Sequence, residues 1–302
     1  MEYRPLGRTG FMASRIGAGD LADRTMQREV CVATLQRAVD WGINVIDTAP
    51  GYEDGYSEEI VGSAITHFRD SVFVISKIDE LDQPIEPQVV ASLERMQTGY
   101  LDGYVYHGLS DMNKYIALRE RADGFRALQE LKTNGRVRNV GISSHHPEVL
   151  LQAMRDGVCD IVMFPIGAYV HPDYILRVLP EAKGRGIGSI CFKTFGAGKL
   201  VTDTTGYGHP VTVRPRGKLS AGDGASGGSK NLSVADCLRY TLTQDPEVAL
   251  LGMSFPSEQD LVRRAYEVYQ PASAEELADI EARAAVARLG KGPCWWNPDP
   301  DA

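Results

Sequence analysis

Four residues of the sequence have side chains suited to proton transfer on a carbonyl group. Asp47, Lys77 and His107 each stand at the end of a short apolar run, and Tyr52 follows Asp47 by five positions. At the ends of neighbouring buried strands, Asp47 and Lys77 would be tolerated as an ion pair, whereas a single buried charge is costly. A lysine beside Tyr52 would lower the pKa of the phenol, because a cation favours the phenolate. Tyr52 is then expected to act as a general acid toward a carbonyl oxygen that His107 also hydrogen-bonds.

Each of these residues alone also has a purely structural interpretation. A strand-end aspartate or histidine is more often a satisfied turn or core group than a catalytic one. Tyr56 is a rival to Tyr52 on residue type alone. The order of the four residues along the chain is what favours a catalytic site.

Short apolar runs alternate with amphipathic segments, which predicts parallel strands covered by helices. The runs expected as strands are 14–19, 43–47, 72–77, 102–107, 136–142, 160–164, 187–192 and 248–252. The segments expected as helices are 24–41, 58–69, 87–99, 123–135, 147–157, 172–186, 233–244 and 257–269. Eight strand–helix units close a (β/α)8 barrel, so we expect a single α/β barrel (TIM barrel) domain over residues 1–302. A doubly wound open sheet is the alternative, since the pattern does not show closure.

Catalytic groups of such barrels project from the C-terminal ends of the strands, where Asp47, Lys77 and His107 are expected. One connection is unusually long: residues 199–231 carry seven glycines and five lysines or arginines in an acidic chain. Barrels often bind phosphate at this end, so the basic loop after strand seven either closes over a pyrophosphate or is a solvated insertion. Residues 273–302 are expected to form a C-terminal helix and tail, with both tryptophans of the tail packed against the barrel.

Composition excludes several classes of function. The chain of 302 residues has a net charge of −8, which argues against a nucleic-acid partner. Its longest uncharged apolar stretch, 161–170, is too short to cross a bilayer, and the first ten residues lack the apolar core of a signal peptide. Five scattered cysteines without a CxxC pair predict thiols in a reducing compartment. We therefore expect a cytoplasmic protein without a membrane partner; the sequence does not indicate an oligomeric state.

The chain resembles the aldo-keto reductase family over nearly its whole length, and is similar to its uncharacterised bacterial and archaeal branches. The segments that carry the resemblance are, in order, YRPLGRTG, IDTAPGYEDGYSEEIVGSAI, ISK, SLERMQTGYLDGYVYHG, GRVRNVGISSHHPEVL, GIGSICFKTFGAGKL and LRYTLTQDPEVALLGMS. The resemblance implies a catalytic tetrad of Asp47, Tyr52, Lys77 and His107. The implied reaction is hydride transfer between a nicotinamide cofactor and an aldehyde, ketone or alcohol, without a metal.

The resemblance also implies where the nicotinamide end of the cofactor binds. The family's contacts to the carboxamide fall at Ser143, Ser144 and Met163, and two of the three differ from the family's residue types. Phe192 is the implied ring-stacking aromatic, and Asp20 is a further implied contact.

The implied contacts to the rest of the cofactor lie later in the chain. Those expected to face the pyrophosphate are Lys193, Gly196 and Gly198. The family's contacts to the adenosine phosphate fall at Met253, Ser254 and Gln259, where two usual cations are absent. Arg263 or Arg264 is a candidate replacement, because a guanidinium suits a phosphate; the alternative, which the sequence favours slightly, is an ordinary exposed helix face. NADP(H) is expected ahead of NAD(H).

Other functions remain open on the sequence alone. A redox-neutral epimerase or isomerase would keep NAD(P) tightly bound, and a sensor would bind nicotinamide without turnover. A Schiff-base aldolase would need a neutral Lys77 or Lys193, and Asp47 is expected to keep Lys77 charged. The adjacent His145 and His146 point to different sides and predict no metal site, although His145 is placed to line the cofactor face. A small polar carbonyl compound or alcohol, such as a sugar, is the expected substrate class.

Overall fold

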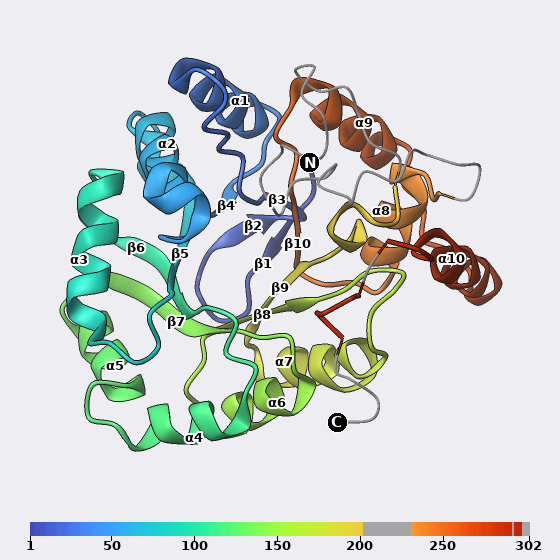
Figure 1. Ribbon diagram of the computed structural model, residues 1–302. Helices are drawn as coiled ribbons and strands as arrows, with labels where there is room; N and C mark the ends of the chain where they lie inside the picture. Colours follow the sequence, from blue (N-terminus) through green and yellow to red (C-terminus); the bar gives the residue numbers. More distant parts are fainter. Residues whose placement is uncertain (202–230, 292, 298–302) are drawn as a thin grey trace.

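Eight parallel strands close into a barrel in the computed structural model, which describes residues 1–201, 231–291 and 293–297 (Figure 1). The strands of the barrel are β3 (Ile16–Ala18), β4 (Val45–Asp47), β5 (Phe73–Ile78), β6 (Leu101–Tyr106), β7 (Val137–Ser143), β8 (Ile161–Pro165), β9 (Gly188–Phe192) and β10 (Val248–Leu251). Each pairs with the next in chain order, and β10 returns to pair with β3. Every run expected as a strand overlaps one of these eight within one or two residues at each end, so the predicted α/β barrel is confirmed and the open sheet is excluded.

Helices cover the outside of the barrel. They are α1 (Arg28–Asp40), α2 (Tyr56–Ile65), α3 (Ile85–Met96), α4 (Met112–Glu120), α5 (Phe125–Thr133), α6 (Pro147–Arg155), α7 (Leu179–Arg185), α8 (Val234–Thr243), α9 (Pro256–Glu267) and α10 (Ala274–Ala287). Figure 1 shows α1 to α9 arranged around the strands, with α10 outside α8. Most of them bury apolar residues at helical spacing; α1, for example, buries Cys31, Leu35 and Ala38. None of the described helices combines the length and apolar character needed to span a membrane.

Two elements were not expected from the sequence. Helix α4 buries only Tyr115 and Leu118, too few for an apolar period to be visible, and it begins because Asp111 accepts hydrogen bonds from the N–H groups at its start. Strands β1 (Tyr3–Pro5) and β2 (Met12–Ser14) form an antiparallel hairpin that precedes the first strand expected from the sequence.

The β1–β2 hairpin closes the N-terminal end of the barrel. Leu6 and Ala13 are fully buried in the apolar cluster that fills the barrel interior. Phe11 packs against Phe73, the first residue of β5, with ring centroids 5.3 Å apart. Polar chemistry is therefore confined to the opposite end, where the strands finish.

Alternation along the strands places the polar residues at that opposite end. Successive residues of a strand point to opposite faces, so residues two apart share a face. Val45, Ile75, Val105 and Ile190 belong to the interior apolar cluster. Two positions further along each chain segment stand Asp47, Lys77, His107 and Phe192. Because residues two apart share a face, the four side chains that follow the interior apolar residues lie at the C-terminal rim of the barrel.

The C-terminal tail is anchored on the barrel by one of its two tryptophans. Trp296 is 1% exposed; its Nε1 donates to the carbonyl oxygen of Tyr169, and its own carbonyl accepts from Tyr174 Oη. The expectation that both tryptophans pack is right for Trp296 and right only in part for Trp295, which is 57% exposed although its ring meets those of His145 and Trp296. Of the basic loop 199–231, residues 202–230 lie outside the described residues.

Candidate active site

Asp47 and Lys77 form a buried ion pair at the C-terminal ends of β4 and β5. Lys77 Nζ lies 2.6 Å from Asp47 Oδ1 and also donates to the carbonyl oxygen of Thr48 at 2.7 Å. The two residues are 5% and 1% exposed, respectively. Burial raises the pKa of Asp47, an effect that the charge and hydrogen bond of Lys77 oppose. The pair satisfies two charges that would each be costly to bury alone.

Tyr52 and His107 complete a cluster with this pair. Tyr52 begins a turn whose next residues, Glu53 and Asp54, have left-handed φ values of 53° and 51°. Non-glycine residues held in this region are strained, and such strain is concentrated at functional sites. Lys77 Nζ lies 4.6 Å from the centroid of the Tyr52 ring, and that ring meets the His107 ring edge-on at 5.6 Å. The structure thus brings all four residues of the expected tetrad together.

The expected lowering of the pKa of Tyr52 is wrong. Burial raises the pKa of Tyr52 well above its ordinary value, and the carboxylates of Asp47, Asp20 and Asp79 raise it further. Lys77 does not offset this, because its ammonium is already paired with Asp47. The phenol is therefore held in its protonated form, which is the form a general acid requires.

Asp79 is a site residue that the sequence analysis missed. Its Oδ1 is hydrogen-bonded to Nδ1 of His107, and its Oδ2 accepts the N–H of Gly51 at 2.5 Å. Gly51 precedes Tyr52, so one carboxylate connects the Tyr52 turn to the His107 ring. The signal was present in the sequence: Asp79 follows Lys77 by two positions, the spacing that puts both side chains on one face of an extended segment.

A second group of side chains continues the site beyond His107. The His145 ring lies 5.3 Å from that of Phe192 and 4.7 Å from that of Trp295. Lys193 Nζ lies 4.5 Å from the Trp295 ring centroid and 5.5 Å from that of Phe192. Burial lowers the pKa of His145 to about 3, with the charges of Lys193 and His107 adding to the effect. His145 and Lys193 thus lie against the same two aromatic rings, those of Phe192 and Trp295.

Lys193 opens the turn that contains the two expected pyrophosphate glycines. Burial lowers the pKa of Lys193 to about 8, and its backbone has a left-handed φ of 73°. The N–H of Gly196 donates to the carbonyl of Lys193 at 2.8 Å, and the N–H of Gly198 donates to that of Phe195 at 3.0 Å. Both glycine N–H groups are therefore used within the turn. Thr194 Oγ1 is buried and has no hydrogen-bond partner among the described residues.

The expected carboxamide contacts are adjacent at the ends of β7 and β8. Ser143 pairs in register with Met163, and both are buried. The N–H of Ser144 donates to the carbonyl of Met163 at 3.0 Å, while its Oγ lies 3.4 Å from Ser110 Oγ and accepts from the N–H of His146 at 3.1 Å. The Ser144 hydroxyl thus stabilises its own loop.

The remaining expected contacts fall in two places. Asp20, just after β3, is buried near the tetrad, where its carboxylate raises the pKa of Asp47 and of Tyr52. Ser254, just after β10, is 2% exposed, and its Oγ has no hydrogen-bond partner in the described part of the chain. An orphaned buried hydroxyl is uncommon and is consistent with a site for a polar ligand.

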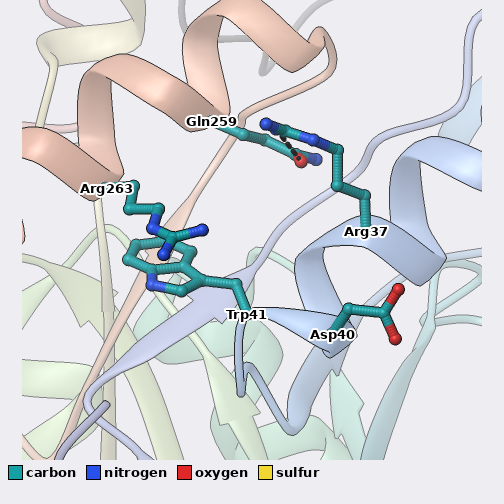
Figure 2. Close-up of a pocket in the computed structure, with 5 residues that line it drawn as sticks. All are labelled: Arg37, Asp40, Trp41, Gln259 and Arg263. Carbon is teal, nitrogen blue, oxygen red and sulfur yellow. Dashed lines mark hydrogen bonds between the residues drawn. The ribbon is translucent and has the colours of Figure 1, made fainter.

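Gln259 and Arg263 line a pocket between α1 and α9, which Figure 2 shows, and Gln259 Nε2 also donates to the carbonyl oxygen of Met253 at 3.3 Å, next to Ser254. The Gln259 amide joins the two helices: its Nε2 donates to the carbonyl oxygen of Thr34 at 2.9 Å, and its Oε1 accepts from Arg37 at 2.9 Å. Arg263 pairs with Glu267 one turn later and is drawn beside the Trp41 ring. The structure does not bring these two residues together with the tetrad.

Within the described ranges, no group of three or more histidine, cysteine, aspartate or glutamate side chains is arranged to hold a metal ion. The site is therefore built from an ion pair, a phenol, an imidazole–carboxylate pair and a neighbouring aromatic wall. Such a constellation can donate or accept one proton at an oxygen atom and can bind a flat ring.

Comparison with known proteins identifies the family. The model of the Aldo/keto reductase family matches residues 15–283. Aldo-keto reductase YhdN of Bacillus subtilis is 36% identical over 223 residues, which are 68% of this chain and 65% of that protein. The NADH-specific methylglyoxal reductase of Escherichia coli is 30% identical over 191 residues, which are 54% of this chain and 58% of that protein. The alignments thus span less than two thirds of the length of these two relatives.

A solved structure shows the same fold. The aldo-keto reductase from Klebsiella pneumoniae in complex with NADPH matches with a TM-score of 0.68 at 24% identity, over 93% of this chain and 94% of that one. The resemblance noted in the sequence is thereby confirmed, and the chain belongs to the Aldo/keto reductase family of oxidoreductases.

Proposed function

We propose that this protein catalyses reversible hydride transfer between NADP(H) and a small carbonyl compound or its alcohol. The observation that carries the proposal is the buried Lys77–Asp47 pair lying under the Tyr52 ring, with His107 edge-on to the same ring. An isolated buried ion pair has structural explanations; one that holds a protonated phenol beside an imidazole is suited to proton transfer at a carbonyl oxygen. We propose that the chain works as one barrel domain in the cytoplasm.

In this mechanism the chain's own residues handle the proton. Tyr52 Oη donates a proton to the carbonyl oxygen as that oxygen gains negative charge. The phenolate left behind is stabilised by the Lys77 ammonium, 4.6 Å from the ring centroid. Asp47 fixes Lys77 in place, and His107 hydrogen-bonds the substrate oxygen so that it faces Tyr52. In the reverse direction the phenolate form of Tyr52 accepts the proton of the alcohol.

The residues present fit a nicotinamide dinucleotide. Phe192 offers a flat aromatic face, Ser143 a buried side chain at the end of β7, and Thr194 and Ser254 orphaned buried hydroxyls just after β9 and β10. We propose that Phe192 and Ser143 hold the nicotinamide, Thr194 and Lys193 the pyrophosphate, and Ser254 the adenosine phosphate. When bound, the nicotinamide supplies or accepts the hydride.

The cofactor preference is proposed to be NADP(H) over NAD(H). The Klebsiella relative was solved with NADPH, whereas the Escherichia coli relative is described as NADH-specific, so the family contains both. Ser254 supports a phosphate contact because its hydroxyl is buried without a partner among the described residues.

The direct test measures NADPH and NADH oxidation with methylglyoxal, 4-nitrobenzaldehyde and an aldose as probe carbonyls, together with calorimetric titration of NADP⁺ and NAD⁺. We expect dinucleotide binding and turnover of at least one probe. A folded protein that binds neither dinucleotide would refute the proposed function.

A further inference from the structure

The contacts of Asp79 go beyond the tetrad. Asp79 stands directly after β5 and His107 directly after β6, and the N–H of His107 donates to the carbonyl of Ile78 at 3.0 Å. This backbone bond keeps the two side chains adjacent. One carboxylate oxygen of Asp79 is hydrogen-bonded to His107 Nδ1, and the other accepts from the N–H of Gly51.

The charge of Asp79 decides where the imidazole carries its proton. Burial opposes ionisation of Asp79, but the hydrogen bonds from His107 and from the Gly51 N–H, with the charge of Lys77, lower the pKa of Asp79 below its ordinary value. An ionised carboxylate can only accept hydrogen bonds. His107 Nδ1 must therefore be the donor, and a neutral imidazole with a protonated Nδ1 has an unprotonated Nε2.

We propose that Asp79 is a positioning residue that fixes His107 with its proton on Nδ1, so that Nε2 accepts a hydrogen bond when the ring is neutral and donates one only when it is charged. This proposal rests on the proposed function, because it assigns the pH dependence of the same site. None of the described residues hydrogen-bonds His107 Nε2, which leaves that nitrogen to the substrate oxygen.

The two substrate forms require opposite states of Nε2. A carbonyl oxygen has only lone pairs and needs a donor, so it favours the charged ring. An alcohol can donate its hydroxyl hydrogen, so it favours the neutral ring, whose Nε2 takes that proton while Tyr52 Oη, protonated in the resting enzyme, hydrogen-bonds the same oxygen. Oxidation of the alcohol breaks a C–H bond, whose electron pair goes with the hydride to the nicotinamide, and an O–H bond, whose proton is left on His107 Nε2. We therefore infer that the enzyme with a neutral His107 ring binds and oxidises alcohols, whereas reduction of an aldehyde requires the ring to carry a second proton.

The charges that face His107 come from every neighbouring strand end. Besides Asp79 they are Asp47 on β4 and Lys77 on β5, and His145 after β7 lies within electrostatic reach. Asp47 is compensated by Lys77, and burial keeps His145 neutral above a pKa of about 3. Asp79 is therefore the anion whose removal changes the His107 proton most directly.

The first experiment reads the proton position without any turnover. Protein labelled with ¹⁵N-histidine is examined by long-range ¹H–¹⁵N NMR, in wild type, Asp79→Asn and Glu80→Gln, with His107 assigned from its loss in His107→Gln; the chain has only six histidines. Glu80 is the matched control, since it is exposed and adjacent in sequence. We expect neutral His107 to carry its proton on Nδ1 in wild type and Glu80→Gln, and to shift toward the Nε2-protonated tautomer in Asp79→Asn. A wild-type ring protonated mainly on Nε2 would overturn the proposal.

The second experiment compares the two directions of one reaction. It measures reduction of 4-nitrobenzaldehyde with NADPH and oxidation of 4-nitrobenzyl alcohol with NADP⁺. Both rates are followed between about pH 5 and 9, the range in which an ordinary imidazole changes its charge. In wild type we expect kcat/KM to fall with rising pH for the aldehyde and to rise for the alcohol. Asp79→Asn should lower alcohol oxidation on the order of 10²-fold, the lower end of general acid–base contributions. It should also flatten the pH profile of aldehyde reduction, because a neutral ring can then donate from Nε2. A parallel loss in both directions would reveal a merely structural role and overturn the proposal.

Failure of the proposed function is distinguishable from failure of this inference. If neither probe is turned over but the proton of His107 lies on Nδ1 and moves in Asp79→Asn, only the proposed activity is refuted. If the protein is active but the tautomer of His107 is the same in wild type and Asp79→Asn, only the role of Asp79 is refuted.

Discussion

The Lys77 ammonium lies 4.6 Å from the centroid of the Tyr52 ring, yet it is bonded to Asp47 at 2.6 Å and leaves the phenol protonated. The lysine therefore does not prepare a phenolate in advance. Its charge becomes useful to Tyr52 only as the proton leaves, so that stabilisation is concentrated in the transition state rather than in the resting enzyme.

Replacing the phenol tests this relationship. Tyr52→Phe should lower kcat/KM for carbonyl reduction on the order of 10²- to 10⁴-fold, the contribution expected of a general acid, while leaving NADP⁺ affinity within about twofold. Tyr56→Phe is the matched control, since Tyr56 is the rival tyrosine and stands at the start of α2. Steady-state kinetics and calorimetry on both variants test the assignment of Tyr52 as the general acid. Equal losses of kcat/KM in the two variants would contradict it.

The buried ion pair should show strong coupling in stability. Asp47→Asn or Lys77→Met alone should each cost about 3–5 kcal/mol of unfolding free energy, because each leaves an uncompensated buried charge. The double variant should lose less than the sum of the two. Urea unfolding of all four proteins gives the coupling energy, and additive losses would show that the two charges do not depend on each other.

Gly51→Ala should reproduce the effect of Asp79→Asn without removing a charge. A Cβ at position 51 would lie 2.6 Å from Asp79 Oδ2, so the carboxylate must move, whereas the backbone φ of −76° at this position suits alanine. We expect alcohol oxidation to fall more than aldehyde reduction, measured with the same nitrobenzyl pair. The prediction fails if Gly51→Ala matches wild type in both directions.

Lys193 should make the stability of the protein depend on alkaline pH. Burial lowers the pKa of Lys193 to about 8 in the folded state, against an unfolded value of 10.5. Between these two values the unfolded chain binds the extra proton, so stability rises with pH over that window. Lys193→Met, which removes the burial cost, should raise Tm near pH 7 by about 2 °C or more and by less near pH 10. Thermal unfolding at both pH values, with exposed Lys183→Met as control, would contradict this if the two variants behave alike.

Ser254 and Arg263 offer competing positions for the adenosine phosphate. Ser254→Ala should weaken NADP⁺ binding by several-fold and leave NAD⁺ binding unchanged, because only the former has a phosphate for the orphaned hydroxyl. Arg263→Ala should change neither, since Arg263 pairs with Glu267 beside Trp41. Calorimetric titration of both dinucleotides tests this directly; a selective loss of NADP⁺ binding in Arg263→Ala would instead assign the phosphate to the pocket between α1 and α9.

The barrel and the tetrad could be predicted because both depend on local patterns. Alternation within a strand fixes which side chains point inward, so an aspartate two positions after Val45 and a lysine two positions after Ile75 necessarily meet at the same rim. The N-terminal hairpin could not be read in this way, since its strands are three residues long. Helix α4 was hidden because only two of its side chains are buried.

Electrostatics were the part that residue types alone could not supply. The sequence places Lys77 near Tyr52, but the direction of the pKa change depends on which neighbour the ammonium pairs with and on three carboxylates around the phenol. Likewise, Asp79 was overlooked because its importance depends on the adjacency of β5 and β6. The backbone hydrogen bond between His107 and Ile78 brings the imidazole next to the residue that follows Ile78, and this residue is Asp79.

The arrangement of the tail has a practical consequence for following the enzyme optically. The chain has three tryptophans; Trp296 is buried as the anchor, Trp41 lies between α1 and α9, and Trp295 stands over Lys193 and His145. Emission from Trp295 therefore originates at the edge of the site, within reach of an ammonium and an imidazole that quench it. In a Trp41→Phe background only Trp295 and the buried Trp296 beside it emit, so a change in fluorescence reports, in real time, a ligand that arrives at or leaves the rim of the barrel.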